Sequence, residues 1–179
     1  LWGADFCRFC GNGSTEGNQA LALALGRPGD RAVISRSMHK SVLAGLVLSG
    51  LEPVWVRPDV DPGTGLPLAL PSERVAAALA EAPDACGVFL VEPSFVGVLS
   101  DVGAIAELAH GAGVPLVVDQ AWGAHFGFHP AVPPHALASG ADAFVASSHK
   151  TLAAFTQSAF LVARGGFLGA FDAEERVRQ

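Results

Sequence analysis

The sequence predicts an α/β fold, with a mostly parallel sheet and helices on both of its faces. Short, unbroken apolar runs alternate along the chain with segments of helical character, which is typical of right-handed βαβ units. Half of the residues are hydrophobic and only 16% are charged, and strands that are buried on both faces have such apolar sequences. With 179 residues, the chain is long enough for one domain with a sizeable core.

Helices are expected where glycine or a capping residue marks the end of a segment. Ser14 or Thr15 is the expected cap of the first helix, and Asp101 that of the fourth. Gly26 and Gly50 are the expected stops of the first two helices. The expected helices span residues 16–26, 38–50, 72–82 and 102–111, and a short one ends at residue 140.

Strands are expected at the apolar runs between these helices. No regular element is evident before residue 14, and the segment 59–71 contains too many prolines and glycines for regular structure. Ligands of parallel sheets bind at the carboxyl ends of the strands, so the residues just after these runs are candidates for a site. The expected strands span residues 31–35, 54–57, 87–91, 115–119, 143–146 and 159–162.

Composition gives no sign of a membrane or nucleic-acid partner. No segment reaches the roughly 18 uninterrupted apolar residues of a membrane span. The formal charge of −6 provides no electrostatic attraction to nucleic acid. The first residues lack the basic start of a signal peptide, so the expected location is the cytoplasm. We expect the chain to be a piece of a larger protein.

Cys7 and Cys10 have the spacing of a zinc ribbon or a redox pair. The remaining cysteine is Cys86, so a four-cysteine zinc site is impossible within the chain. We therefore expect ordinary thiols and no metal site. A zinc-binding module built on Cys7 and Cys10 is a remote alternative, which metal analysis would test.

Two strand ends carry the residues that pyridoxal phosphate chemistry requires. Lys150 lies just past the apolar run 143–146, and Asp119 ends the run 115–119. A lysine amine can form a Schiff base with the cofactor aldehyde. A carboxylate can keep the pyridine nitrogen protonated, so that the ring accepts electrons. The pair predicts a site for this cofactor, although each residue also has an ordinary alternative, a helix cap for Asp119 and a surface lysine for Lys150.

Three further segments provide groups that suit the same cofactor. Residues 11–18 form a glycine-rich turn before a helix, where backbone N–H groups and the hydroxyls of Ser14 and Thr15 can bind phosphate. An ordinary capped loop is the alternative. His39 can stack on a planar ring or be an exposed polar residue, and Ala121 leaves room for a flat ring. His149 is either a proton relay or a polar neighbour of Lys150.

Four segments, in order and spacing, resemble the ornithine/lysine/arginine decarboxylase family of fold-type I pyridoxal phosphate enzymes. Segment 147–158 resembles the cofactor-lysine segment of that family, and segment 117–125 its aspartate segment. Segment 13–18 resembles its phosphate loop, and segment 37–50 its ring-stacking histidine segment. The similarity covers residues 9–164. It implies that residues 1–179 form the cofactor-binding large domain, incomplete at both ends and lacking the C-terminal small domain.

The resemblance also implies a reaction and a set of roles. The reaction is decarboxylation of arginine, lysine or ornithine to an amine and CO₂, through a Schiff base on Lys150. Asp119 would hold the pyridine nitrogen, and His149 would donate a proton. His39 and Ala121 would contact the two ring faces. The implied phosphate ligands are Ser14, Thr15 and Ser147.

The chain departs from the family pattern in ways that affect the substrate. Gln120 stands where the family often has an acidic or small residue, and segment 93–97 lacks the tyrosines of its counterpart. Glu92 is a guess for the group that binds the distal cation of a substrate. Transamination, carbon–carbon lyase chemistry and a non-catalytic assembly role are alternatives. The family implies a homodimer or larger assembly, with the loop 122–134 as a candidate contact, although core packing is the more usual use of its rings.

Overall fold

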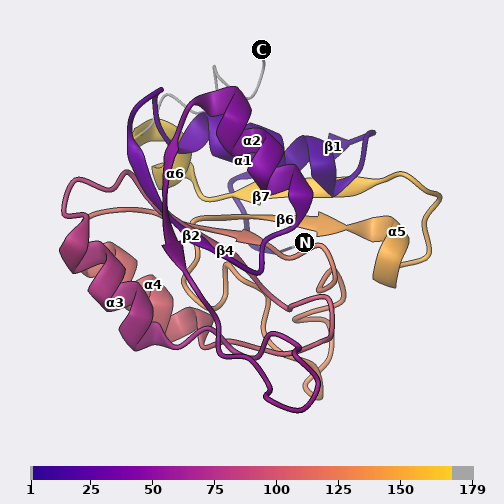
Figure 1. Cartoon of the computed structure of the whole chain (residues 1–179). Helices are drawn as coiled ribbons and strands as arrows, with labels where there is room; N and C mark the ends of the chain where they lie inside the picture. Colours follow the sequence, from indigo (N-terminus) through magenta and orange to yellow (C-terminus); the bar gives the residue numbers. More distant parts are fainter. Residues whose placement is uncertain (1, 171–179) are drawn as a thin grey trace.

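A seven-stranded sheet organises the chain, whose computed structural model describes residues 2–170. The strands lie in the order β1-β7-β6-β5-β4-β2-β3, and helices cover both faces (Figure 1). The predicted α/β fold is therefore confirmed. The strands are β1 (Phe6–Cys10), β2 (Arg31–Ser35), β3 (Glu52–Val56), β4 (Val88–Val91), β5 (Leu116–Asp119), β6 (Ala143–Ser147) and β7 (Ala159–Ala163).

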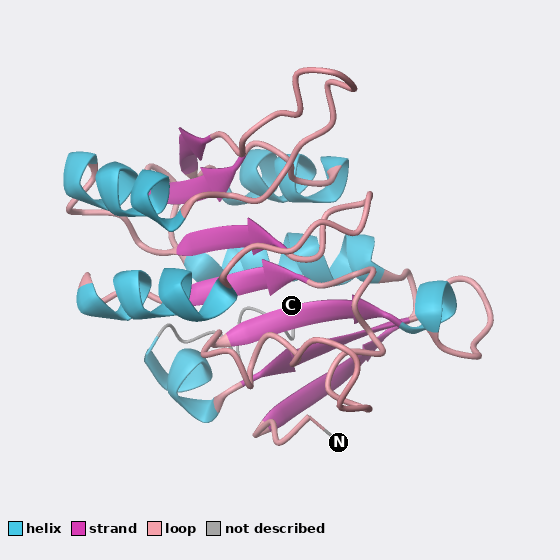
Figure 2. Cartoon of the chain, turned by 90° about the horizontal axis from the view of Figure 1, so that it is seen from below, coloured by secondary structure: helices cyan, strands magenta, loops and turns pink. Residues whose placement is uncertain are grey.

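Five neighbouring strands are parallel, and the pairing at one edge of the sheet is antiparallel. Strands β3, β2, β4, β5 and β6 pair in parallel, whereas β7 is antiparallel to both β6 and β1. In Figure 2 the strands form a twisted row, with the loops that follow the parallel strands on one side. Strand β1 was not expected from the sequence. Its middle residues are exposed, so it lacks an apolar run, and it owes its order to pairing with β7.

The helices divide between the two faces of the sheet. Helices α1 and α2 pack against each other on one face, and α3 and α4 lie on the opposite face (Figure 1). All four predicted helices are confirmed, with ends shifted by at most a few residues. The helices are α1 (Ser14–Leu25), α2 (Lys40–Ser49), α3 (Ser72–Glu81), α4 (Val102–Gly111), α5 (Ser148–Thr151) and α6 (Gly165–Ala170).

Alternate residues of the central strands face two separate hydrophobic cores. In β5, Leu116 and Val118 belong to the core beneath α3 and α4, whereas Val117 belongs to the core beneath α1 and α2. In β4, Phe89 faces the α1/α2 side, between Val88 and Leu90 of the other core. Side chains of successive strand residues point to opposite faces. Burial on both faces therefore explains why these strands have continuous apolar sequences.

The short helix expected before Gly140 is wrong, because residues 136–140 form turns. The Ala136 N–H donates to the side chain of Gln120 at 2.7 Å, and the Ala141 N–H returns to the Ala136 carbonyl at 3.0 Å. Gly140 has a φ of +100°, which a helix does not allow. Among the described residues, no helix is long and apolar enough to cross a membrane.

Candidate active site

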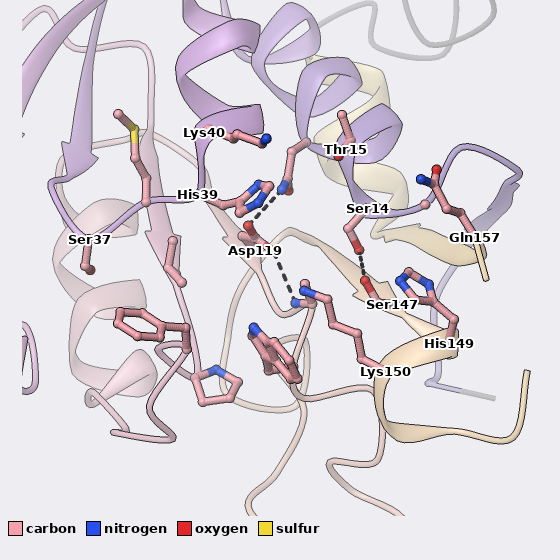
Figure 3. Close-up of a pocket in the computed structure, with 18 of the residues that line it drawn as sticks. Ser14, Thr15, Ser37, His39, Lys40, Asp119, Ser147, His149, Lys150 and Gln157 are labelled. Carbon is pink, nitrogen blue, oxygen red and sulfur yellow. Dashed lines mark hydrogen bonds between the residues drawn. The ribbon is translucent and has the colours of Figure 1, made fainter. Parts of the chain in front are cut away.

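A cavity of about 660 Å³ opens at the carboxyl ends of the parallel strands. It lies between the beginnings of α1 and α2 and the segments that follow β4, β5 and β6. Its volume is in the usual range for a small-molecule site. The structure brings all of the predicted site residues to this cavity (Figure 3): Ser14, Thr15, His39, Asp119, Ala121, Ser147, His149 and Lys150.

Asp119 ends β5 and lies on the floor of the cavity, with only 2% of its surface exposed. Burial raises the pKa of its carboxyl group, and hydrogen bonds oppose this shift. Asn18 Nδ2 donates to Oδ2 at 2.7 Å, and the Ala121 N–H donates to Oδ1 at 3.1 Å. Both carboxyl oxygens are thus held by N–H donors, which favour the ionised form.

Lys150 projects from the short helix α5, which directly follows β6. Its amine points toward the cavity in Figure 3 and lies 4.3 Å from the centroid of the Trp122 ring. Partial burial lowers the pKa of the amine, and the charge of Asp119 opposes this change. A lowered pKa increases the fraction of neutral amine, which is the nucleophilic form.

The beginning of α1 lines the cavity with groups that suit an anion. The first turn of this helix has no side-chain cap, so its N–H groups are available to a bound anion. Ser14 and Ser147 are buried, and their hydroxyl oxygens are 2.6 Å apart. Gly13 precedes the helix with φ +72° and ψ −168°, a conformation that is nearly restricted to glycine. Thr15 is exposed and also lines the cavity.

His39 is the N-cap of α2 and lines the cavity from that side. Its Nδ1 accepts a hydrogen bond from the Ser41 N–H at 3.2 Å. His149 lies in α5, next to Lys150. Its Nδ1 is 2.7 Å from the Ser158 carbonyl oxygen and 3.1 Å from the Ser158 nitrogen. We assign the shorter contact as an Nδ1–H donor, which orients the ring in the cavity wall.

Several residues near the site do not line the cavity. Glu92 is buried, and its carboxylate accepts the Ser100 N–H at 2.8 Å, so its guessed contact with a substrate is not supported. Gln120 is also buried, and it holds Gly123 and Ala136 through its amide. Its departure from the family pattern therefore has a structural reason. Ser148 donates to Ser158 instead of facing the cavity.

Two residues with contacts to the site were not predicted to act there. Asn18 hydrogen-bonds Asp119 although 101 residues separate them, and Trp122 lies over the amine of Lys150. Asn18 is the last residue of the predicted phosphate turn, residues 11–18, and this position is its sequence signal. Trp122 lies within the aspartate segment 117–125, three positions after Asp119.

The cysteines show no arrangement for metal binding. Cys7, Cys10 and Cys86 are free thiols, and burial raises the pKa of both Cys10 and Cys86 to about 11. Within residues 2–170, no cluster of three or more His, Cys, Asp or Glu side chains has metal-ligating geometry.

Comparison with protein-family models identifies the chain. The model described as Orn/Lys/Arg decarboxylase, major domain, matches residues 1–178. The chain belongs to the Orn/Lys/Arg decarboxylase family. This match confirms the resemblance seen in the four sequence segments.

Curated relatives extend the family relation along nearly the whole chain. Arginine decarboxylase of Bacillus subtilis is 36% identical over 167 residues, which is 93% of this chain and 34% of the relative. The uncharacterized protein YaaO of the same organism is 42% identical, covering 90% of this chain and 34% of the relative. Lysine decarboxylase LdcA of Pseudomonas aeruginosa is 25% identical over 92% of this chain. The chain spans about a third of the length of the first two relatives.

Solved structures of fold-type I enzymes share the architecture. N-succinyldiaminopimelate aminotransferase from Mycobacterium tuberculosis matches 96% of this chain and 44% of its own, with a TM-score of 0.74 and 19% identity. Cystathionine γ-lyase CalE6 of Micromonospora echinospora matches 98% of this chain and 43% of its own, with a TM-score of 0.71 and 25% identity. A structure described as SPT with PLP matches 95% of this chain and 41% of its own, with a TM-score of 0.74 and 19% identity. The predicted large-domain fold is confirmed.

Proposed function

We propose that the complete protein decarboxylates a basic amino acid, namely arginine, lysine or ornithine, with pyridoxal phosphate as its cofactor. One observation carries this proposal. Lys150 and Asp119 line a single cavity at the carboxyl ends of the strands, in a chain of the Orn/Lys/Arg decarboxylase family. Family membership supports the reaction, and the geometry supports the cofactor.

The residues of the cavity fit pyridoxal phosphate. The uncapped first turn of α1, together with Ser14 and Ser147, suits a phosphate group. Asp119 is a buried carboxylate held by two N–H donors, and a protonated pyridine nitrogen would compensate its charge. Thr15 would add a phosphate contact, and His39 and Ala121 would bracket the ring.

When bound, pyridoxal phosphate supplies an aldehyde that reacts with amines and a ring that stabilises negative charge on Cα as CO₂ leaves. Lys150 would provide the amine that holds the cofactor covalently. Asp119 keeps the proton on the ring nitrogen, and its dry surroundings strengthen this electrostatic effect. His149 is held at Nδ1 by Ser158, and its Nε2 could deliver a proton to Cα when the ring is in the imidazolium form.

Covalent trapping tests the assignment of Lys150. The chain contains only two lysines, Lys40 and Lys150. Borohydride reduction of the complete holoenzyme should attach the cofactor to the peptide that contains Lys150, as seen by mass spectrometry. The Lys150→Ala variant should lose both the label and CO₂ release, whereas Lys40→Ala should keep the label. Retention of a cofactor label by Lys150→Ala would contradict the proposal.

A second candidate is another reaction on the same fold. The structural neighbours include an aminotransferase and a lyase, so the fold alone does not select the bond that breaks. Measuring CO₂ against keto-acid formation from the same amino acid distinguishes these reactions. A folded, complete protein that binds no cofactor would instead favour a non-catalytic role.

We also propose that the complete protein is a homodimer or larger assembly, as the family implies. The aromatic rings of the candidate contact loop, residues 122–134, are partly buried in the core and partly exposed. Phe126 is buried, and Phe128 is half exposed and packs edge-on against Trp2. Outside this loop, the ring of Phe155 is more exposed than that of Phe128, with 96% of its surface exposed. Phe155 directly precedes Thr156 and Gln157, which line the cavity. Phe155 is therefore the better candidate for an intersubunit contact.

A further inference from the structure

The amide of Asn18 joins two residues that belong to different parts of the cavity. Asn18 lies in α1 with 1% of its surface exposed. Its Nδ2 donates both to Asp119 Oδ2 at 2.7 Å, one of the bonds drawn in Figure 3, and to Ser41 Oγ in α2 at 2.9 Å. Its Oδ1 is buried and has no hydrogen-bond partner among the described residues. The side chain therefore acts here purely as a donor.

The donor direction continues from Ser41 to His39. The Ser41 hydroxyl accepts from Asn18, so its own hydrogen is available to His39 Nδ1, which lies 2.8 Å away. The Ser41 N–H donates to the same Nδ1. A nitrogen that accepts these bonds carries no hydrogen, and the ring hydrogen of a neutral histidine is then on Nε2. The chain of bonds thus runs in one direction, from Asn18 to His39.

We infer that Asn18 is a positioning residue, which orients the Asp119 carboxylate toward the cofactor ring and, through the Ser41 hydroxyl, reinforces the Nε2–H tautomer of His39. This inference rests on the proposed function, in which Asp119 holds the ring nitrogen. Without the Asn18 donor, Oδ2 of Asp119 would keep no protein hydrogen bond among those described. The carboxylate would then bind a proton more readily and lose its hold on the charged ring.

Space filling alone does not explain Asn18. Burying an amide costs free energy unless its groups are hydrogen-bonded, and the unpartnered Oδ1 adds to that cost. A leucine of similar size would avoid both costs. The amide has value because its two N–H groups connect residues that are 23 and 101 positions away in the sequence.

Cofactor affinity with and without the ring nitrogen tests the inference. We would measure the binding of pyridoxal phosphate, and of its carbocyclic analogue with CH in place of the ring nitrogen, to the complete apoprotein. Asn18→Leu should weaken pyridoxal phosphate binding by about tenfold or more, the usual effect of losing a hydrogen bond to a charged group. It should leave the affinity for the analogue nearly unchanged, because the analogue has no nitrogen for Asp119 to hold.

Controls separate this inference from the proposed function. Gln19→Ala, at the next position of α1, should bind both compounds like the wild type. Equal weakening of both compounds in Asn18→Leu would show a merely structural role and overturn the inference. A wild-type protein without preference for pyridoxal phosphate over the analogue would overturn the role of Asp119 itself, and with it the proposed site.

A measurement on the wild type keeps the inference testable if Asn18→Leu does not fold. Nitrogen-15 NMR of the histidine rings in the complete apoprotein should show His39 with its hydrogen on Nε2 at neutral pH. An Nδ1–H tautomer would reverse the donor direction at Ser41 and overturn the inference. The His39→Asn variant assigns the signal.

Discussion

At the scale of single residues, the fold buries Asp119 and supplies donors that oppose the resulting rise in the pKa of its carboxyl group. Burial raises the pKa of this carboxyl group, while Asn18, the Ala121 N–H and the charge of Lys150 act in the opposite direction. Lys150 is in turn shifted toward the neutral amine by burial. The shift at Lys150 favours the nucleophilic amine that the proposed chemistry needs, whereas at Asp119 the hydrogen bonds and the charge of Lys150 limit a rise in pKa that burial causes.

Asp119→Asn should reduce CO₂ release by about 10²–10³-fold, the usual cost of removing a preorganised electrostatic partner. The asparagine oxygen can still accept from Asn18, so the fold should persist. Steady-state kinetics at saturating cofactor would measure the effect mainly in kcat. Asp61→Asn, at an exposed turn that Asp61 closes by bonding Thr64, serves as control. An Asp119→Asn enzyme with full turnover would contradict the proposed role.

Glu92 predicts a pH dependence of stability that is independent of catalysis. Burial raises its pKa from 4.5 to about 7. Between these values the folded protein holds a proton that the unfolded chain has released, so stability falls as pH rises through this window. The loss amounts to roughly 3 kcal/mol above pH 7.

Glu92→Gln should therefore be more stable than the wild type at pH 8 and lose this advantage near pH 4. Glutamine keeps an oxygen for the Ser100 N–H. Urea unfolding at both pH values measures the difference. A stability gain that is the same at both values would show that the pKa of Glu92 is not raised.

At the scale of elements, two glycines allow α1 to lie between β6 and α2. A Cβ at Gly17 would come within 2.8 Å of Val145 in β6, and a Cβ at Gly45 within 2.8 Å of Ala22 and 3.2 Å of the Gln19 backbone. These close approaches set the position of α1, and therefore also the positions of its first turn and of Asn18 in the cavity.

Gly45→Ala should destabilise the protein by about 1–3 kcal/mol, because the extra methyl group meets the backbone of α1. Gly111→Ala is the matched control, since its Cβ would meet nothing within 4 Å in α4. That variant should gain up to about 1 kcal/mol from helix propensity. Thermal unfolding of both variants measures the contrast. A Gly45→Ala protein as stable as the control would show that α1 and α2 can separate without cost.

The elements also show what a sequence can predict. Strands such as β5 were predicted because burial on both faces requires continuous apolar residues. Strand β1 has exposed residues and becomes regular only when β7 pairs with it, which no local pattern reveals. The turns at 136–140 depend on a hydrogen bond that the Ala136 N–H donates to the side chain of Gln120, 16 residues away. Asn18 is a similar case, since its function depends on partners brought by other elements.

At the scale of the whole molecule, the sheet brings the candidate groups together at the carboxyl ends of its parallel strands. The segments that carry Ser14, His39, Asp119 and Lys150 are distant in sequence, and their convergence requires the parallel strand order. The four segments could be predicted as site segments because ligands of parallel sheets bind where the carboxyl ends of the strands lie side by side. The exposed Phe155 directly precedes Thr156 and Gln157, which line the cavity, and this loop connects the site to the proposed assembly.

Phe155→Asp should weaken self-association of the complete protein by about tenfold or more, because a charge would replace an aromatic contact. Sedimentation velocity over a range of concentrations measures the effect. Cofactor affinity should fall together with association, because Thr156 and Gln157 of the same loop line the cavity. Ala80→Asp adds the same charge at an exposed position of α3 and should leave association unchanged. If Phe155→Asp associates as tightly as Ala80→Asp, the contact lies elsewhere and this ring has another use.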